Sequence, residues 1–156
     1  MKLLSYHENG IYIVWGVDEK QDLRLLHVSS LPFQKEDIKV ESMDYGFRFV
    51  ELQLSGFDRP YERHGNKYIV TAPGYRMKYV SHSESRNENG LQLLFVLRDD
   101  LTDVYVDAYV QFYDGLAIVR MWQVIRNEGT ETQTVEYISG FNYEGIEKEG
   151  LAPRDE

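Results

Sequence analysis

Residues 103–113 alternate with a period of two between two kinds of side chain, and this pattern constrains the fold more than any other feature. The even positions are aliphatic or aromatic, whereas the odd positions hold tyrosines and polar residues. A period of two places neighbouring side chains on opposite faces of a β-sheet. Asp114-Gly115 follows at once, and this pair favours a tight turn. The stretch therefore predicts the first strand of an antiparallel hairpin, with one aliphatic face and one tyrosine-rich face.

The predicted return strand, residues 117–126, is apolar on both sides except at Arg120 and Gln123. We expect it to be a central strand covered on both faces, with Trp122 in the core and Trp15 likewise buried. Further strand-like runs lie at residues 11–17, 23–28, 47–54, 75–82, 91–98 and 132–141. Turn residues separate these runs at regular intervals, which is typical of an antiparallel sandwich. The sequence predicts an all-β fold of two packed sheets with little helix, residues 34–39 and 145–156 being loops or single helical turns.

Length and charge narrow the class of protein. A chain of 156 residues is the size of one domain and is too short for a (β/α)₈ barrel, which needs about 250 residues. Its net charge of −9 repels phosphate, so we expect neither nucleic acid nor an anionic membrane as a partner. Without cysteine it forms no disulfide, and its N-terminus lacks the apolar core of a signal peptide. These features favour a soluble cytoplasmic protein.

Acidic residues are numerous, so carboxylate pairs are easy to find. Glycosidases hold two carboxyl groups about 5 Å apart when they retain configuration and about 6.5–9.5 Å apart when they invert it. The nearest pairs in the sequence are Asp58 with Glu62, and Asp99 with Asp100. We interpret both pairs as solvated loop charges and turn formers, because Asp initiates turns between strands. The sequence therefore predicts no catalytic residue.

The four histidines form no close ligand pair, and no thiolate is present to complete a metal site. A nucleophile elbow, a phosphate-binding loop and the dinucleotide-binding glycine pattern are also missing from the sequence. We therefore predict neither a metal ion nor a cofactor. His64, beside Gly65, is the histidine for which a loop or interface role remains open.

Tyr105, Tyr109 and Tyr113 repeat on one face of the predicted hairpin. Such a face either packs against a neighbouring domain or forms a shallow platform on which sugar rings stack. Sparse charge among the tyrosines favours docking. The platform would make the chain a self-contained carbohydrate-binding module, which stays open as a second reading.

A series of short motifs runs in order from residue 33 to residue 145. They lie at residues 50–56, 58–60, 64–67, 73–76, 79–82, 96–99, 111–120, 127–130 and 137–141. Their order and spacing resemble the N-terminal domain of α-galactosidases of glycoside hydrolase family 36. The resemblance implies a β-supersandwich that precedes a catalytic (β/α)₈ barrel and a C-terminal β-domain.

The same resemblance implies a function for the longer enzyme. It would be a retaining α-galactosidase that removes terminal α-galactosyl residues from oligosaccharides such as melibiose and raffinose. Its two catalytic aspartates lie in the barrel, the nucleophile within a Lys-Trp-Asp motif that neither tryptophan here matches. Residues 1–156 are then a single inactive N-terminal domain, cut before the barrel. Its partners would be that barrel, in the same polypeptide, and further copies in a homo-oligomer.

In tetrameric members of that family, a loop of the N-terminal domain reaches towards an active site with a Gly-Asn-Thr-Asp-Phe-Arg-x-Pro pattern. Residues 65–73 match its position but lack the Asp and the Arg. The loop at residues 55–67 offers four other polar side chains for sugar hydroxyls or for a bridge to the barrel. These candidates are Asp58, Arg59, Arg63 and His64.

A third reading is an aldose mutarotase-like enzyme, because supersandwiches also serve that chemistry. The chain is short for this activity, and its sequence offers no convincing pair of a histidine and a carboxylate. We rank this reading last.

Overall fold

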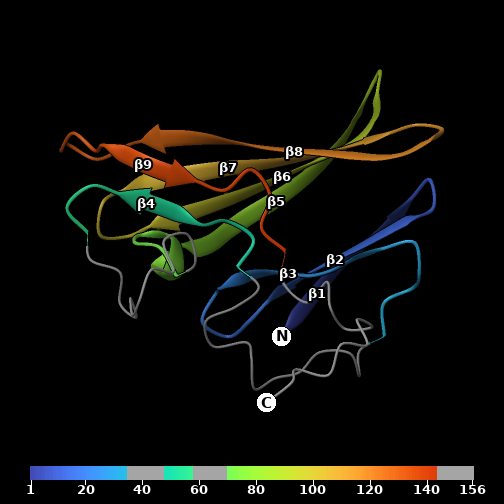
Figure 1. The fold of residues 1–156 in the computed structure, drawn as a ribbon, viewed down its shortest axis with the longest axis horizontal. Coiled ribbons are helices and arrows are strands. Elements are labelled where there is room, and N and C mark those ends of the chain that lie inside the picture. The colour runs from blue at the N-terminus through green and yellow to red at the C-terminus, as the bar shows by residue number, and fades with distance from the viewer. Residues whose placement is uncertain (35–47, 58–69, 144–156) are drawn as a thin grey trace, which may run out of the picture.

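The structure is a computed structural model that describes residues 1–34, 48–57 and 70–143. These residues are built almost wholly from β-strands joined by short turns (Figure 1). The elements are β1 (Lys2–Glu8), β2 (Ile11–Val17), β3 (Leu23–Ser29), β4 (Leu52–Leu54), the 3₁₀ turn η3 (Gly74–Arg76), β5 (Lys78–Asn87), β6 (Gly90–Asp99), β7 (Val104–Tyr113), β8 (Leu116–Asn127) and β9 (Val135–Ile138).

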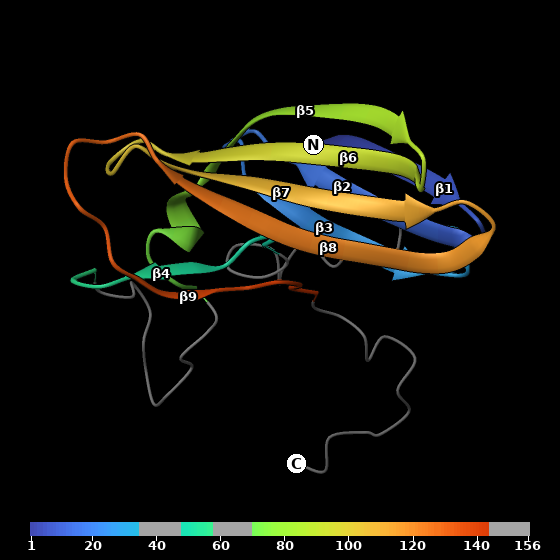
Figure 2. The same ribbon diagram turned by 90° about the horizontal axis from the view of Figure 1, so that it is seen from above.

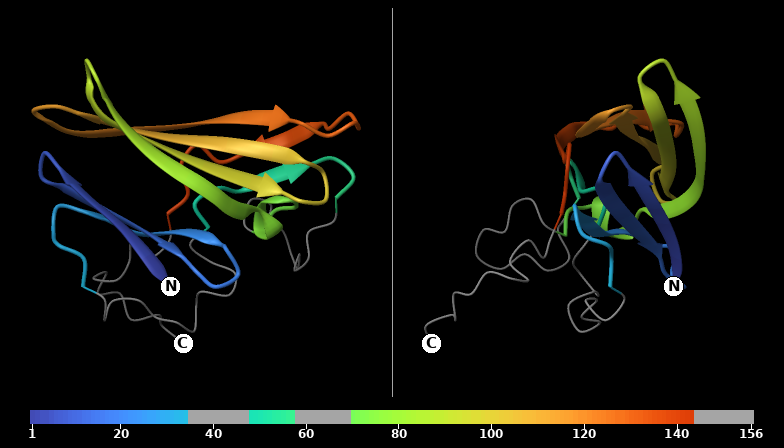
Figure 3. Two further views of the ribbon diagram at one scale, coloured as in Figure 1. Left: turned by 180° about the vertical axis from the view of Figure 1, so that it is seen from behind. Right: turned by 90° about the vertical axis from the view of Figure 1, so that its right-hand side faces the viewer.

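The described strands form three antiparallel sheets, in the orders β1-β2-β3, β4-β9 and β5-β6-β7-β8. Figures 1 and 2 show the four-stranded sheet stacked over the three-stranded one, with the β4–β9 ribbon beside them at one end. The turns β1–β2 and β7–β8 lie at the opposite end (Figure 3). The predicted all-β fold of two packed antiparallel sheets is therefore confirmed.

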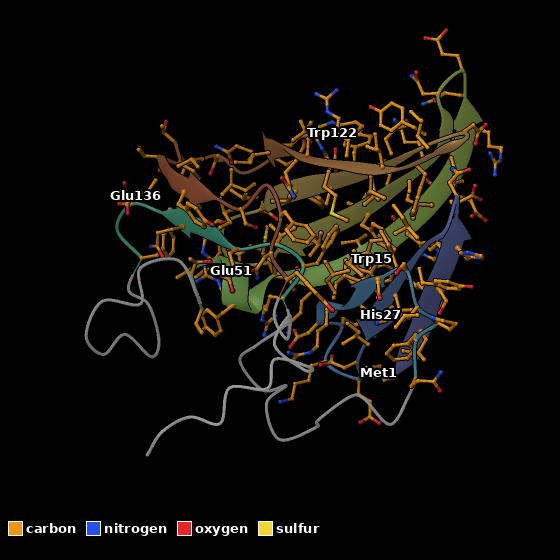
Figure 4. All side chains as sticks on the ribbon, turned by 45° about the vertical axis from the view of Figure 1, so that its right-hand side comes forward. Met1, Trp15, His27, Glu51, Trp122 and Glu136 are labelled. Atoms are coloured by element: carbon orange, nitrogen blue, oxygen red, sulfur yellow. The ribbon has the colours of Figure 1, made fainter. Side chains whose placement is uncertain are left out.

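The core fills the space between the two larger sheets. Trp15 on β2 is fully buried, and its ring centroid lies 4.8 Å from that of Phe95 on β6 and 5.6 Å from that of Phe49. Figure 4 shows Trp15 between the sheets. Aromatic pairs of this kind add about 0.5–1.5 kcal/mol each beyond the area they bury. The prediction that Trp15 is a core residue is confirmed.

The two-residue alternation in β7 has the predicted outcome. Val104, Val106, Ala108, Val110 and Phe112 are buried against the other sheet, and the intervening positions mostly face outwards and are half-buried. The hairpin closes between Tyr113 and Leu116 around Asp114-Gly115, as predicted. Gly115 has a φ of +77°, in the left-handed region that glycine adopts without strain.

The prediction for the return strand is wrong. In the described residues β8 pairs with β7 alone and forms an edge of the sheet. The register sets Trp122 opposite Tyr109, on the outer face, so Trp122 is half-buried and not a core residue (Figure 4). A strand that is apolar on both sides was interpreted as doubly covered, whereas here the outer side is open.

Other boundaries also shift. β1 was not predicted, because among its side chains only Leu4 is buried and its sequence has no clear alternation. The predicted run at 75–82 begins as η3, and the strand itself runs on to Asn87. The runs at 47–54 and 132–141 contract to the short strands β4 and β9. Residues 35–39 and 145–156 lie outside the described residues.

Candidate functional site

The four predicted site residues fall in one stretch of chain that the structure does not describe. Asp58, Arg59, Arg63 and His64 all belong to residues 58–69, so their roles remain predictions. The structure does describe both ends of that stretch, at Phe57 and Val70. The described part of the candidate site therefore consists of the side chains that hold these two ends.

A buried carboxylate holds the end at Val70. Glu51, directly before β4, is fully buried, and its carboxylate accepts the backbone N–H of Val70 at 3.2 Å and that of Thr71 at 2.9 Å. The hydroxyl of Thr71 donates to the same carboxylate. Val70 has a φ of +56°, a strained conformation for a β-branched residue, so Glu51 helps to hold a bend that the backbone disfavours.

Gln53 ties the two ends together. Its Nε2 donates to the carbonyl oxygens of Leu54 and Phe57, both at 2.9 Å, and its Oε1 accepts the N–H of Ala72 at 3.0 Å. One buried side chain therefore contacts the chain before and after residues 58–69. We call Glu51, Gln53 and Thr71 the loop anchor.

The anchor is packed too tightly to tolerate a side chain at Gly74. A Cβ built there would lie 2.6 Å from the backbone nitrogen of Leu52 and 3.1 Å from a carboxylate oxygen of Glu51. Ser139, just after β9, closes the other side of the anchor. Its hydroxyl accepts the N–H of Glu51, and its own N–H donates to the Glu51 carbonyl oxygen, both at 2.9 Å.

Sequence reasoning missed the anchor, although a signal was present. Glu51 and Gln53 stand two residues apart inside an otherwise apolar run, so both point to the same side of a buried strand. Buried polar side chains are nearly always hydrogen-bonded. The pair therefore indicated that a segment with free backbone groups would lie against this strand.

Asp99 and Asp100 do not form a catalytic pair. Asp99 is buried, with its carboxylate held by Arg76 at 2.6 and 2.9 Å and by the hydroxyl of Thr102 at 2.6 Å. Asp100 is exposed. Asp99 is a turn former, as predicted, but the prediction that it is solvated is wrong, because Arg76 and the turn enclose it. Asp58 and Glu62 lie outside the described residues.

Asp22 collects cations at the turn before β3. It is buried, and its carboxylate lies 2.7 Å from Lys78, 2.9 Å from Arg48 and 3.3 Å from Arg24. Burial alone would raise the pKa of Asp22, but the hydrogen bonds and charges of Lys78 and Arg48 outweigh it and lower the pKa below its ordinary value. Because every cation here is held by this acid, we assign the cluster to stability and not to catalysis.

The outer face of the four-stranded sheet carries stacked aromatic rings. Tyr109 and Trp122 face each other across β7 and β8 with centroids 5.0 Å apart and planes 3° apart. The guanidinium of Arg120 lies 5.3 Å from the centre of the Trp122 ring. The π surface of Trp122 is therefore already in contact with two side chains of the chain itself.

Tyr105, further along the same face, is enclosed by two arginines. The guanidiniums of Arg126 and Arg98 lie 4.8 and 5.6 Å from its ring centre. Asp107 accepts two hydrogen bonds from Arg126, at 2.7 and 3.0 Å, and these raise the pKa of Arg126 further above its already high value. Trp, Tyr and Arg are the residues most enriched at protein interfaces, so this face has the composition of a contact surface.

Across residues 1–34, 48–57 and 70–143, no three His, Cys, Asp or Glu side chains come together to hold a metal ion. Over the same ranges, no helix has the length and apolar character needed to cross a lipid bilayer.

Solved structures that resemble this chain include α-galactosidases of glycoside hydrolase family 36. The chain superposes on the family 36 α-galactosidase AgaA of Geobacillus stearothermophilus with a TM-score of 0.57 at 11% identity, covering 83% of this chain and 23% of AgaA. For AgaB of the same organism the TM-score is 0.56 at 12% identity, covering 83% and 22%. An AgaA variant in complex with raffinose gives 0.55 at 13% identity, covering 82% and 22%.

The chain has the fold of part of these family 36 enzymes. It spans less than a quarter of their length. No protein-family model and no curated protein sequence matches the chain. The fold predicted from the motif series is thus confirmed by the structure, whereas the activity has to be argued from the residues.

Proposed function

We propose that this chain is the non-catalytic N-terminal domain of a retaining α-galactosidase, which hydrolyses terminal α-galactosyl residues of oligosaccharides such as melibiose and raffinose. The fold likeness over 83% of the chain carries the proposal. The buried carboxylates Glu51, Asp22 and Asp99 support it, because each is engaged by internal hydrogen bonds or ion pairs. In this proposal the reacting aspartates belong to a barrel in the same polypeptide, and the enzyme acts in the cytoplasm.

The domain would frame the active site through the stretch that the loop anchor holds. Glu51 and Gln53 hold Phe57, Val70 and Thr71, which flank residues 58–69 in the sequence. Within that stretch, Asp58, Arg59, Arg63 and His64 are the proposed groups for contacts to sugar or to the barrel. Rigid ends matter because a polar group misplaced by about 1 Å loses most of its benefit for binding or catalysis.

In this proposal the outer face of the four-stranded sheet packs against another domain or subunit. A carbohydrate-binding module is the second candidate, because the Tyr109–Trp122 pair offers aromatic surface. The contacts of Arg120 with Trp122, and of Arg98 and Arg126 with Tyr105, favour packing instead. A sugar that stacks on these rings would have to displace those arginines.

An activity assay tests the main proposal. The full-length polypeptide should hydrolyse an aryl α-galactoside, and the 156-residue chain, purified at the same molar concentration, should not. An aryl β-galactoside is the control substrate and should be inert with both proteins. Turnover of the α-galactoside by the short chain, or none by the full-length polypeptide, would contradict the proposal.

Titration calorimetry separates the two candidates. We expect no heat when galactose, melibiose or raffinose is added to the short chain. Heat that disappears in a Trp122→Ala variant would instead establish a sugar-binding module on the outer face. A Val80→Ala variant, on the far edge strand β5, serves as the matched control.

A further inference from the structure

The two edge strands of the four-stranded sheet are protected very differently. β5 carries Lys78, Glu84 and Arg86 among serines, and a register shift interrupts its pairing between Tyr79 and Ser81. Charges and bulges of this kind stop an edge from pairing with another strand. β5 is therefore built to remain an edge.

β8 has fewer of these features. It runs for 12 residues without a proline, a lysine or an acid, its charged residues are Arg120 and Arg126, and its register is shifted only at the hairpin turn. Leu116 and Ile118 are 53% and 52% exposed. A long apolar edge strand is a template for pairing with a further strand. In the described part of the chain, no strand fills that place.

An apolar groove lies along the inner side of β8. Its volume is about 570 Å³, and it separates Val119 and Met121 on β8 from Ile11 and Val28 on the other sheet. Phe141 lines its wall and is 52% exposed. Figures 1 and 2 show β8 and β3 as the strands that border this side of the sandwich. The groove is thus an opening between the two sheets that nothing in the described residues fills.

We propose that β8 and this groove receive an extended strand from the adjoining part of the same polypeptide. The strand would add to the sheet beside β8 and place alternate apolar side chains in the groove. This inference rests on the proposed function, because it needs a longer chain. The adjoining part of the same polypeptide is the favoured occupant because the solved α-galactosidase AgaA is a much longer chain, and the matched part is only 23% of it.

Charge disfavours a second copy in this place. Each copy carries a net charge of −9, so two copies repel each other at low salt. β8 itself carries only the cations Arg120 and Arg126, and within the described residues no carboxylate pairs with Arg120. The incoming strand is therefore expected to carry a carboxylate on its outer side, opposite Arg120, and apolar residues on its inner side.

Single cysteines can test this placement, because the chain contains no cysteine of its own. Val119→Cys places a thiol in the groove, and Ser83→Cys places a matched thiol on the exposed β5 edge. The rate of reaction with dithionitrobenzoate is measured in the 156-residue chain and in the full-length polypeptide. We expect the Val119→Cys thiol to react at least about tenfold more slowly in the full-length protein, and the Ser83→Cys thiol to react equally in both.

Equal rates for Val119→Cys in the two proteins would overturn the inference. A rate in the short chain that rises on dilution would also overturn it, because a second copy would then cover the groove. Met121→Cys is the second probe if Val119→Cys does not fold. Hydrolysis of an aryl α-galactoside is measured on the same samples. An active enzyme with an unprotected groove rejects this inference alone, and an inactive protein with a protected groove rejects only the proposed function.

Discussion

Trp15 and Trp122 share a residue type and the same expectation from sequence, but they lie in opposite environments. Trp15 is enclosed by Phe49 and Phe95 between two sheets. Trp122 stacks on Tyr109 on the open face of an edge strand. An apolar sequence pattern indicates that a side chain is favourably buried, but it does not show whether other parts of this chain bury it. Trp15 is buried by other parts of this chain, whereas Trp122 remains half-buried on the outer face.

The largest expected effect tests that contrast directly. Trp15→Ala should lower the free energy of unfolding by about 3–5 kcal/mol, because it leaves a cavity among packed rings. Trp122→Ala should cost about 1 kcal/mol, because the side chain is only half-buried and loses one stacking contact. Urea unfolding monitored by far-ultraviolet circular dichroism measures both. Equal losses in the two variants would show that Trp122 is part of the core.

Substitutions in the loop anchor extend the comparison to a buried polar side chain. Glu51→Leu should cost about 3 kcal/mol, because the N–H groups of Val70 and Thr71 lose their buried acceptor. Glu51→Gln keeps one acceptor oxygen and should cost less than half as much. Urea unfolding gives both values.

Limited trypsin digestion adds a local readout for the anchor. Cleavage after Arg63 or Lys67 should speed up more in Glu51→Leu than cleavage elsewhere. Uniform acceleration at all sites would show that Glu51 supports the whole sandwich and not the loop ends.

Asp22 makes a smaller contribution that depends on pH. Its pKa in the folded protein is lowered from the ordinary value of 3.8, chiefly because Lys78 and Arg48 outweigh the opposing effect of burial. The stabilisation is therefore complete above pH 3.8 and is lost as pH falls through the lower folded pKa. Asp22→Asn removes this dependence, so the stability gap between wild type and variant should be constant near neutral pH and should shrink in acid.

Urea midpoints measured at several pH values from neutral down into the acid range check this. A gap that widens in acid would mean that the folded pKa is raised. Glu19→Gln, which removes an exposed carboxylate from the same turn, is measured in parallel as the matched control.

The sequence predicted those parts of the fold in which side chains are buried by other parts of the same chain. The alternation in β7 and the Asp114-Gly115 turn reflect local geometry, so the hairpin was predicted almost to the residue. β1 was missed because its pairing with β2, and not its own pattern, defines it. Glu51 and Gln53 stand out locally as polar residues in an apolar run, but the sequence does not show that Thr71 and Ala72, about twenty residues away, are their partners. Whether β8 is an edge strand or a central strand depends on the elements that lie beside it, and its own sequence does not show this.

The smallest effect is expected on the outer face. Asp107 and Asp99 each make a two-bond pair with an arginine, but their side chains are 14% and 1% exposed. Asp107→Asn should lower the free energy of unfolding by only about 0.5 kcal/mol, because water screens the pair. Asp99→Asn should cost about 2 kcal/mol or more, because Arg76 and Thr102 lose a buried partner. Chemical denaturation at low and high salt measures the stability loss in both variants. Only the loss caused by Asp107→Asn should become smaller at high salt. Equal, salt-independent losses would mean that the outer face is already shielded from solvent in the isolated chain, and the distinction between the two faces of the sheet would no longer hold.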